Sequence, residues 1–336
     1  MVLAVCGGCS TGAGSTGRTD DGGVEGSVVS PPLDGGPAPG HVAVTLASLT
    51  TAAQFLAVSS SDLYVTSDDS ALYQIPLSGG TPVALVSGQS EAEGIALFGT
   101  TVYWLNAEVS DDPDGGANGA IMSVPVTGGA STTLVTGQTF PYDIAVDSTG
   151  LYWVNAGECT SPTQCTGSVM KAPLAGGTPV VLASALTSPE SIAIDATNVY
   201  WGTADGRLMK VPKSGGTPTQ LAYYETSVDA VLVDATNVYW ATGSGDLMET
   251  PIAGGASTAL WVSSQSIFGL VMDDSNFYFT TEDDLDNVGV VQRLPIGGGT
   301  PTTLWSGSDY PEAIQVDATS VYFGTQSGAV VKLSPK

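Results

Sequence analysis

The sequence predicts an all-β fold, a seven-bladed β-propeller, with six or eight blades as the alternatives. An aromatic strand of the type Val-Tyr-Trp recurs seven times along the 336 residues. Its tyrosines are spaced by 39 to 49 residues, the length of a propeller blade, and they are Tyr64, Tyr103, Tyr152, Tyr200, Tyr239, Tyr278 and Tyr322. Gly-Gly turns recur between these strands, and no segment has the apolar period of a helix.

Each repeat contains four short strands, as residues 189–223 illustrate. An apolar inner strand is expected at 191–195 and the aromatic strand at 199–203, with a three-residue turn between them. The third strand at 207–212 and the outer strand at 219–222 are joined through Gly215-Gly216. Glycine provides the positive φ that such a tight hairpin requires, at no steric cost.

The count of repeats predicts how the ring closes. Seven aromatic strands are accompanied by only six Gly-Gly turns, because the sequence stops after a third strand at 329–333. A spare outer strand is available at 42–47. We expect this N-terminal strand to pair beside the C-terminal one, because closure removes the exposed edge of the sheet. Residues 43–336 then form a single propeller domain.

The segment before the propeller predicts export. Residues 1–10 resemble the end of a bacterial lipoprotein signal, in which a short apolar stretch reaches Cys6 and Cys9, the candidates for lipidation. Residues 11–42 are rich in Gly, Ser, Asp and Pro and are expected to be a disordered tether, because they offer little apolar surface to bury. The protein is therefore predicted to be an outer-membrane or cell-surface lipoprotein, or a secreted protein.

The charge balance excludes one class of partner. Thirty-three acidic and eight basic residues give a formal net charge of −25. Such a surface repels nucleic acid and anionic lipid headgroups, so membrane contact is expected only through a lipid anchor. The same field attracts cations and basic protein surfaces. The simpler interpretation is that the charge keeps a β-rich protein soluble and monomeric.

The cysteines outside the N-terminal segment are close in sequence. Cys159 and Cys165 are separated by five polar residues between two expected strands. We predict a disulfide between them, which implies an oxidising compartment, and two free thiols are the alternative. A zinc site would need four ligands, and the only histidine, His41, is far away in sequence.

Two stretches carry a resemblance to a known family. Residues 168–177 and the inner and aromatic strands over 189–201 resemble the YWTD-type β-propellers of lipoprotein-receptor ectodomains and their bacterial relatives. The resemblance implies a propeller over about 43–336, although that family is usually six-bladed. It implies no receptor-type ligand, because the final Asp of the motif is replaced in every repeat, by Ser67, Asn106, Asn155, Thr203, Thr242, Thr281 and Thr325.

A second, weaker resemblance is to seven-bladed bacterial lyases and to metal-dependent lactonases that work in a propeller channel. The lyases use a histidine and a metal at the channel mouth. His41 precedes the ring, so a histidine general base is not expected in this channel.

One position of the inner strand predicts a ring of side chains at the channel mouth. Aligned over the seven repeats, it contains Gln54, Glu93, Tyr142, Glu190, Asp229, Phe268 and Glu312. The four carboxylates would repel one another unless a cation compensates, so Ca²⁺ or another divalent metal is the hypothesis for Glu93, Glu190, Asp229 and Glu312. Gln54, Tyr142 and Phe268 would contact a ligand. A solvated acidic rim, or side chains that point sideways, are the alternatives.

The aspartates at the other end of these strands are expected to be structural and to lie on the opposite face. Each precedes a tight turn, where a carboxylate accepts backbone N–H bonds, and they are Asp147, Asp195, Asp234, Asp273 and Asp317.

Three functions remain open at the level of the sequence. The favoured one is an exported, non-catalytic scaffold that binds a protein, peptide or glycan through the loop face, where acidic loops at 111–114 and 282–286 are longer than in other repeats. The second is a metal-dependent hydrolase or lyase, lactonase-like, at the channel mouth. The third is a structural protein of the cell envelope or extracellular matrix. No nucleophile motif in a strand–turn–helix setting and no cofactor fingerprint is present, which favours binding over catalysis.

Overall fold

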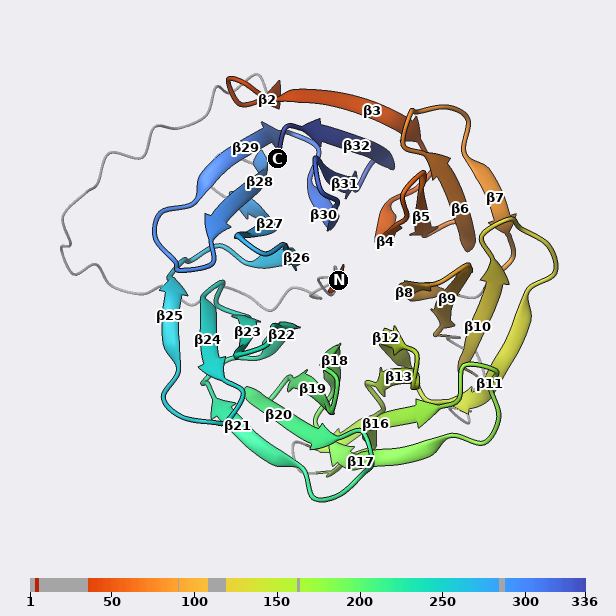
Figure 1. Ribbon diagram of the computed structural model, residues 1–336, viewed down its shortest axis with the longest axis vertical. Coiled ribbons are helices and arrows are strands. Elements are labelled where there is room, and N and C mark those ends of the chain that lie inside the picture. Colours follow the sequence, from red (N-terminus) through yellow and green to blue (C-terminus); the bar gives the residue numbers. More distant parts are fainter. Residues whose placement is uncertain (1–3, 6–35, 90, 108–118, 162–163, 284–287) are drawn as a thin grey trace.

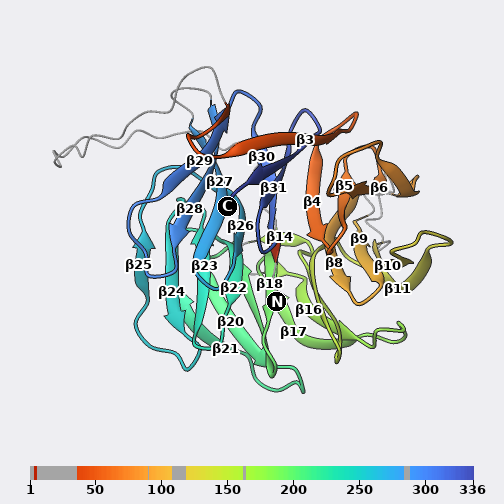
Figure 2. The same ribbon diagram turned by 45° about the horizontal axis from the view of Figure 1, so that its top comes forward.

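Seven antiparallel sheets surround a central channel in the computed structural model, and each sheet is one blade (Figure 1). The structure describes residues 4–5, 36–89, 91–107, 119–161, 164–283 and 288–336. Figure 2 shows the same ring tilted, with the blades standing side by side around the channel. Within the residues that the structure describes, no helix is long and apolar enough to cross a membrane.

In the first four blades, the strands follow one another from the channel outward. Blade 1 contains β4 (Ala53–Val58), β5 (Asp62–Ser67), β6 (Ala71–Pro76) and β7 (Val83–Val86). Blade 2 contains β8 (Ala92–Phe98), β9 (Thr101–Asn106), β10 (Gly119–Pro125) and β11 (Thr132–Gln138). Blade 3 contains β12 (Pro141–Asp147), β13 (Gly150–Asn155), β16 (Gly167–Ala172) and β17 (Val180–Leu186). Blade 4 contains β18 (Pro189–Ile194), β19 (Asn198–Thr203), β20 (Arg207–Pro212) and β21 (Thr219–Tyr223).

The last three blades repeat this order. Blade 5 contains β22 (Val228–Val233), β23 (Asn237–Thr242), β24 (Leu247–Pro251) and β25 (Thr258–Trp261). Blade 6 contains β26 (Ile267–Met272), β27 (Asn276–Asp283), β28 (Val288–Pro295) and β29 (Thr302–Gly307). Blade 7 contains β30 (Pro311–Val316), β31 (Val321–Thr325), β32 (Ala329–Ser334) and, as its outer strand, β3 (Val42–Ser48). The seven-bladed all-β prediction is confirmed.

The ring closes as the repeat count predicts. Strand β3 pairs antiparallel with β32, from Val42 opposite Ser334 to Ser48 opposite Ala329. The last blade is therefore built from both ends of the propeller. This arrangement makes separation of blades 7 and 1 require the rupture of a full strand pair.

The ordered part of the chain begins before residue 43, where the sequence placed the domain boundary. Strand β2 (Gly36–Pro37) pairs with the outer edge of β29, and the N–H of Ala38 donates to the carbonyl of Leu304 at 2.8 Å. A further short strand, β1 (Ala4–Val5), pairs with β26 at the channel. The lipidation candidates Cys6 and Cys9 lie outside the described residues.

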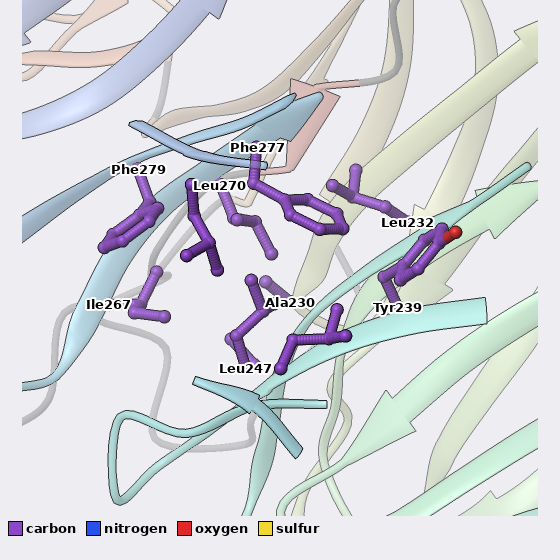
Figure 3. Packing of buried hydrophobic residues seen from close by; sticks show 11 residues of the cluster. Ala230, Leu232, Tyr239, Leu247, Ile267, Leu270, Phe277 and Phe279 are labelled. Carbon is purple, nitrogen blue, oxygen red and sulfur yellow. The ribbon is translucent and has the colours of Figure 1, made fainter. Parts of the chain in front are cut away.

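The hydrophobic core is divided into seven clusters, each between two neighbouring blades. Figure 3 shows the cluster of blades 5 and 6, where the Tyr239 and Phe277 rings meet edge to face with centroids 4.9 Å apart. The aromatic strands supply most of the largest fully buried side chains, including Trp104, Trp153 and Trp201. Each buried aromatic or aliphatic side chain stabilises the fold by about 1.5–3 kcal/mol. The repeated motif is thus the motif that packs blade on blade.

Polar side chains also connect neighbouring blades. Asp143 of β12 is buried and accepts the N–H of Ile192 of the next blade at 2.9 Å. Lys171 and Lys210 donate from their third strands to backbone carbonyls of the following blade, those of Lys213 and Ile252. Arg293 of blade 6 makes the equivalent contact with the carbonyl of Lys336, because the repeat places the same donor and acceptor side by side in these blades.

The Gly-Gly turns of blades 3 and 6 approach the preceding blade closely. Gly176 has a φ of +78°, and a Cβ atom there would lie 2.5 Å from the carbonyl oxygen of Leu134. The next residue, Gly177, donates its N–H to that same oxygen at 3.2 Å. Only glycine combines this backbone conformation with this approach.

The predicted disulfide loop forms a small hairpin on blade 3. Strands β14 (Cys159–Ser161) and β15 (Gln164–Cys165) pair with Cys159 opposite Cys165. Cys165 is disulfide-bonded. The side chain of Cys159 is outside the described part of the chain, so the Cys159–Cys165 bond stays a prediction.

Candidate functional site

The inner strands bring all seven predicted ring residues to one mouth of the channel, which we call the first mouth. Each ring residue is the second residue of its inner strand, and a break in strand register adjoins it in every blade. Each is half-buried, whereas the residues on either side of it are buried. A bulge re-aims a side chain relative to the regular pleat. The seven side chains are therefore the partly exposed ones at this end of the strands, and their neighbours pack between blades.

Carboxylates concentrate on the side of the first mouth formed by blades 1, 2 and 7. Burial, together with the nearby charges of Glu91 and Asp68, raises the pKa of Glu93 to about 7. Burial also raises the pKa of Glu312, and Asp68 is among the charges that add to this increase. One carboxylate oxygen of Glu312, Oε2, is buried without a hydrogen-bond partner. Asp68 thus contributes charge to both ring residues.

A cavity of about 350 Å³ lies beside these carboxylates. Its walls include Asp68, Glu91 and Glu93 together with two aromatic side chains, Phe55 and Tyr142. The two aromatic rings meet edge to face, with centroids 6.5 Å apart. This cavity, which we call the rim cavity, combines negative charge with apolar surface.

The side-chain amide of Gln54, the ring residue of blade 1, orients the carboxylate of Asp68. Gln54 donates from Nε2 to Oδ1 of Asp68 at 2.7 Å, and both residues line the rim cavity. Gln54 and Tyr142 therefore lie where a ligand of the rim cavity would contact them. Phe268 occupies the equivalent position on β26 and is not among the residues that line this cavity.

A second pair of carboxylates lies across blades 4 and 5. Burial and the neighbouring Asp229 raise the pKa of Glu190, whose Oε1 accepts the Ser188 hydroxyl at 3.1 Å. Burial raises the pKa of Asp229 as well. The four acidic ring residues therefore separate into a group around Asp68 and a pair.

This separation bears on the predicted metal site. Within the described ranges, no three His, Cys, Asp or Glu side chains are grouped so that they could hold one metal ion. Glu93, Glu190, Asp229 and Glu312 are distributed around the channel rather than gathered on one point. A divalent-metal site on these four residues, and a Ca²⁺ requirement, stay predictions.

The loops that enter the first mouth contain unusual backbone conformations. Glu91, Phe140 and Ser188 have positive φ values of 41°, 51° and 38°. Each lies two residues before a ring residue, in blades 2, 3 and 4. A non-glycine residue in this region costs on the order of 1–3 kcal/mol and is kept where its surroundings require it. The entry loops are therefore held in fixed positions around the mouth.

Sequence reasoning missed Asp68, Glu91 and Phe55. Asp68 lies in the turn between the second and third strands of blade 1, and Glu91 precedes the inner strand of blade 2. Their convergence depends on how two neighbouring blades meet, and the repeat pattern within one blade does not report it. The excess of acid in both loops was the available signal.

At the opposite end of the channel, the second mouth, the terminal aspartates have the structural role that the sequence predicts. Oδ1 of Asp195 accepts the N–H groups of Thr197 and Asn198, and Oδ2 accepts the Tyr200 hydroxyl at 2.6 Å. The same pattern recurs at Asp234, Asp273 and Asp317. Although burial alone would raise their pKa, these hydrogen bonds, preceded at Asp273 by the stronger effect of Lys336, hold the pKa of all four carboxyls below the usual range.

Three of the seven residues that replace the final Asp of the YWTD motif close hairpins. Thr203 Oγ1 accepts the N–H of Arg207 at 3.1 Å, and Thr242 Oγ1 accepts that of Asp246 at 3.0 Å. Thr325 does the same with Ala329. In these three blades, a threonine hydroxyl therefore accepts a backbone hydrogen bond across the turn that follows.

Comparison with known proteins supports the fold. No family model matches the chain, and no curated protein matches it in sequence. A chain of the nidogen–laminin complex is similar with a TM-score of 0.52 and 18% identity, over 73% of this chain and 95% of that chain. Virginiamycin B lyase from Staphylococcus aureus is similar with a TM-score of 0.61 and 11% identity, over 88% and 98%.

A third similar structure is YCF48 from Cyanidioschyzon merolae, with a TM-score of 0.62 and 13% identity, over 87% of this chain and 98% of that chain. All three identities are low. The similarity establishes the seven-bladed β-propeller fold, and it includes both a chain from a protein complex and a lyase.

Proposed function

We propose that this protein is an exported, non-catalytic propeller scaffold that binds a protein or peptide partner through its first mouth. The rim cavity is the observation that supports this most directly. Burial and, after it, repulsion from Glu91 and Asp68 raise the pKa of Glu93, and a basic side chain placed among these carboxylates would offset both effects. The aromatic rings beside these carboxylates suit the apolar part of such a side chain, and aromatic residues are enriched at interfaces.

The charge of the whole chain supports the same partner. A net charge of −25 increases the rate at which a basic surface associates. The entry loops at Glu91, Phe140 and Ser188 supply a fixed backbone around the cavity. A rigid backbone around the mouth limits the entropy lost on binding.

The hydrolase alternative has less support. The only histidine in the sequence, His41, contacts the carbonyl of Pro335 at 2.7 Å and lies beside the outer strand of blade 7. It is far from the channel in which a general base would act. Because related folds include a lyase as well as a member of a protein complex, the fold alone favours neither function.

A binding screen tests the proposal. The wild type is presented to an array of defined basic peptides and to a glycan array, beside the variants Glu93→Gln and Asp68→Asn. We expect a subset of Lys- or Arg-containing peptides to bind the wild type and both variants to bind them at least tenfold more weakly. Glu249→Gln removes the same charge from the third strand of blade 5 and is the control. Selective glycan binding, or equal binding by all variants, would contradict a basic partner in the rim cavity.

A thermal shift measurement separates the scaffold from the metal-dependent enzyme. A metal at a hundred times its Kd adds about 2.7 kcal/mol of stability. For the scaffold we expect the same Tm in EDTA, Ca²⁺, Mg²⁺ and Zn²⁺. A metal that stabilises the wild type but not a Glu93→Gln/Glu190→Gln/Glu312→Gln variant would favour the enzyme and make lactone and ester substrates worth screening.

A further inference from the structure

The second mouth contains a larger cavity than the first, about 730 Å³ in volume. Its walls include Asp195, Asp234, Asp273 and Asp317 and one basic side chain, Lys336. Hydrogen bonds hold the pKa of all four aspartates below the usual range against the effect of burial, so they are ionised at neutral pH. We call this space the second-mouth cavity.

The second-mouth cavity already holds an ammonium group, that of Lys336. Its Nζ lies 2.6 Å from Oδ2 of Asp273 and donates to the carbonyl of Asp317 at 2.7 Å. It also lies 5.8 Å from the centre of the Tyr278 ring. Oδ2 of Asp273 accepts the Tyr278 hydroxyl as well, so one oxygen serves both the tyrosine and the ammonium. The aspartate that closes a turn therefore has capacity left for a cation.

Blade 3 repeats this arrangement. Lys213 forms an ion pair with Oδ2 of Asp147, and its Nζ lies 4.9 Å from the centre of the Tyr152 ring. Lys213 is only 7% exposed, so this ammonium is held inside the protein. Two independent blades thus seat a lysine on an aspartate beside a tyrosine.

The two lysines occupy one position of the repeat. Lys213, Ile252 and Ile296 directly follow their third strands, and Lys336 follows β32 after Pro335. Each of the four donates its backbone N–H to the inner turn of its own blade, which makes the positions equivalent. From this position, Lys213 reaches Asp147 of the preceding blade, and Lys336 reaches Asp273 of the preceding blade.

In blades 5 and 6 the same position holds isoleucine. The aspartates that Ile252 and Ile296 would face are Asp195 and Asp234 of the preceding blades. Three ion pairs are present among the described residues, and neither Asp195 nor Asp234 takes part in one. Both carry the same turn and tyrosine hydrogen bonds as Asp273. These two aspartates form the same seat without its lysine.

We propose that the second-mouth cavity binds an aliphatic primary ammonium group, seated on Asp195 and Asp234 as Lys336 is seated on Asp273. The alkyl chain would lie against Val233, Met272 and Ile296, which line the same cavity. The ammonium can belong to a small polyamine or to a lysine side chain of a peptide, since both present the same chemistry. This site is separate from the rim cavity and does not depend on the proposed function.

Calorimetric titration with spermidine and with N-acetyl-lysine amide at low ionic strength tests the proposal. The decisive variant is Ile252→Lys/Ile296→Lys, which supplies internal lysines at the position where blades 4 and 7 have them. We expect it to fold and to bind spermidine at least tenfold more weakly than the wild type. The control Ile252→Met/Ile296→Met keeps the apolar surface without the charge and should bind like the wild type.

A variant with the opposite effect keeps the test independent of folding defects. Lys336→Met frees Asp273, so spermidine should bind at least threefold more tightly. Tighter binding of spermidine than of N-acetyl-lysine amide identifies a polyamine site, and the reverse identifies a lysine side chain as the ligand. Absence of binding by both probes, or equal binding by the wild type and the double lysine variant, would overturn the proposal.

The rim cavity is excluded as the source of the signal by a third variant. Glu93→Gln alters the first mouth only, so it should leave spermidine binding unchanged. If spermidine binding instead follows Glu93, the ammonium site belongs to the first mouth and the assignment to Asp195 and Asp234 is wrong.

Discussion

The two mouths of the channel carry carboxylates on the same inner strands, and the two sets behave in opposite ways. At the second mouth, Asp195 accepts two backbone N–H groups and a tyrosine hydroxyl, and its pKa is held low against the effect of burial. At the first mouth, Glu93 is raised to a pKa of about 7 by burial and by neighbouring carboxylates.

The difference shows what distinguishes a structural acid from a candidate binding acid. A carboxylate that accepts the donors of its own turn stabilises the fold and stays charged, whether or not it also takes a cation. A half-buried carboxylate near like charges has no such turn donors. The second-mouth aspartates should therefore govern stability, and the first-mouth carboxylates should affect mainly the binding of a partner in the rim cavity.

The largest expected effect on stability comes from replacing the acidic residue at each end of β18, in turn, by alanine. Asp195→Ala removes the acceptor of two N–H groups and leaves the Tyr200 hydroxyl without its partner, which costs about 2–3 kcal/mol. Glu190→Ala at the other end should change the unfolding free energy by less than about 0.5 kcal/mol. Urea denaturation measures both, and equal losses would remove the distinction between the mouths.

The next effect is a pH dependence of stability at the first mouth, where the pKa of Glu93 is raised and not lowered as at the second mouth. The pKa of Glu93 in the folded protein, about 7, is above its ordinary value of 4.5, so the folded state binds the proton more tightly. Its contribution is favourable at pH values below the ordinary pKa and is lost as the pH rises through about 7.

We therefore expect Glu93→Gln to be more stable than the wild type at pH 8, by on the order of 2 kcal/mol, and about equal to it near pH 4. Unfolding free energies at several pH values measure this difference. A gain of stability that is the same at all pH values would show that repulsion at the first mouth is not its cause.

A smaller effect on stability is expected from removing the hydroxyl group that donates a hydrogen bond to a carboxylate at each mouth. Tyr239→Phe removes the bond to Asp234 Oδ2 and should cost about 1 kcal/mol and raise the pKa of Asp234. Ser188→Ala removes the bond to Glu190 and should cost less, because Glu190 contributes no turn contact. Thermal unfolding of both variants, with carboxyl titration by NMR, provides the comparison. A larger loss at Ser188 would reverse the ranking.

The smallest expected effect is a gain. Ile296→Lys should place an ammonium beside Asp234, as Lys213 does beside Asp147, and should raise the stability by up to about 0.5 kcal/mol at low salt. The gain should decrease as sodium chloride is added, because salt screens partly exposed charges. A loss of stability that salt does not alter would show that the position cannot seat a lysine in blade 6.

Much of the architecture follows from the sequence by itself. The tyrosine spacing predicts seven blades, and the missing seventh Gly-Gly turn predicts closure by β3 on β32. The positions of Gln54, Glu93 and their equivalents at one end of the inner strands could also be predicted, because each blade repeats one inner-strand pattern. Periodicity within a blade depends on residues that are close in the sequence, so it can be predicted from the sequence.

Contacts between blades were decided only by the tertiary structure. Asp68 approaches Glu93 of the next blade, and Lys336 reaches back to Asp273, through paths that no single repeat contains. Whether a carboxylate accepts hydrogen bonds or an ion pair depends on which groups the neighbouring turns and blades place beside it. The sequence by itself therefore determined where the carboxylates lie in each blade, and the packing of blade against blade determined which of them hold the fold and which are available to a ligand.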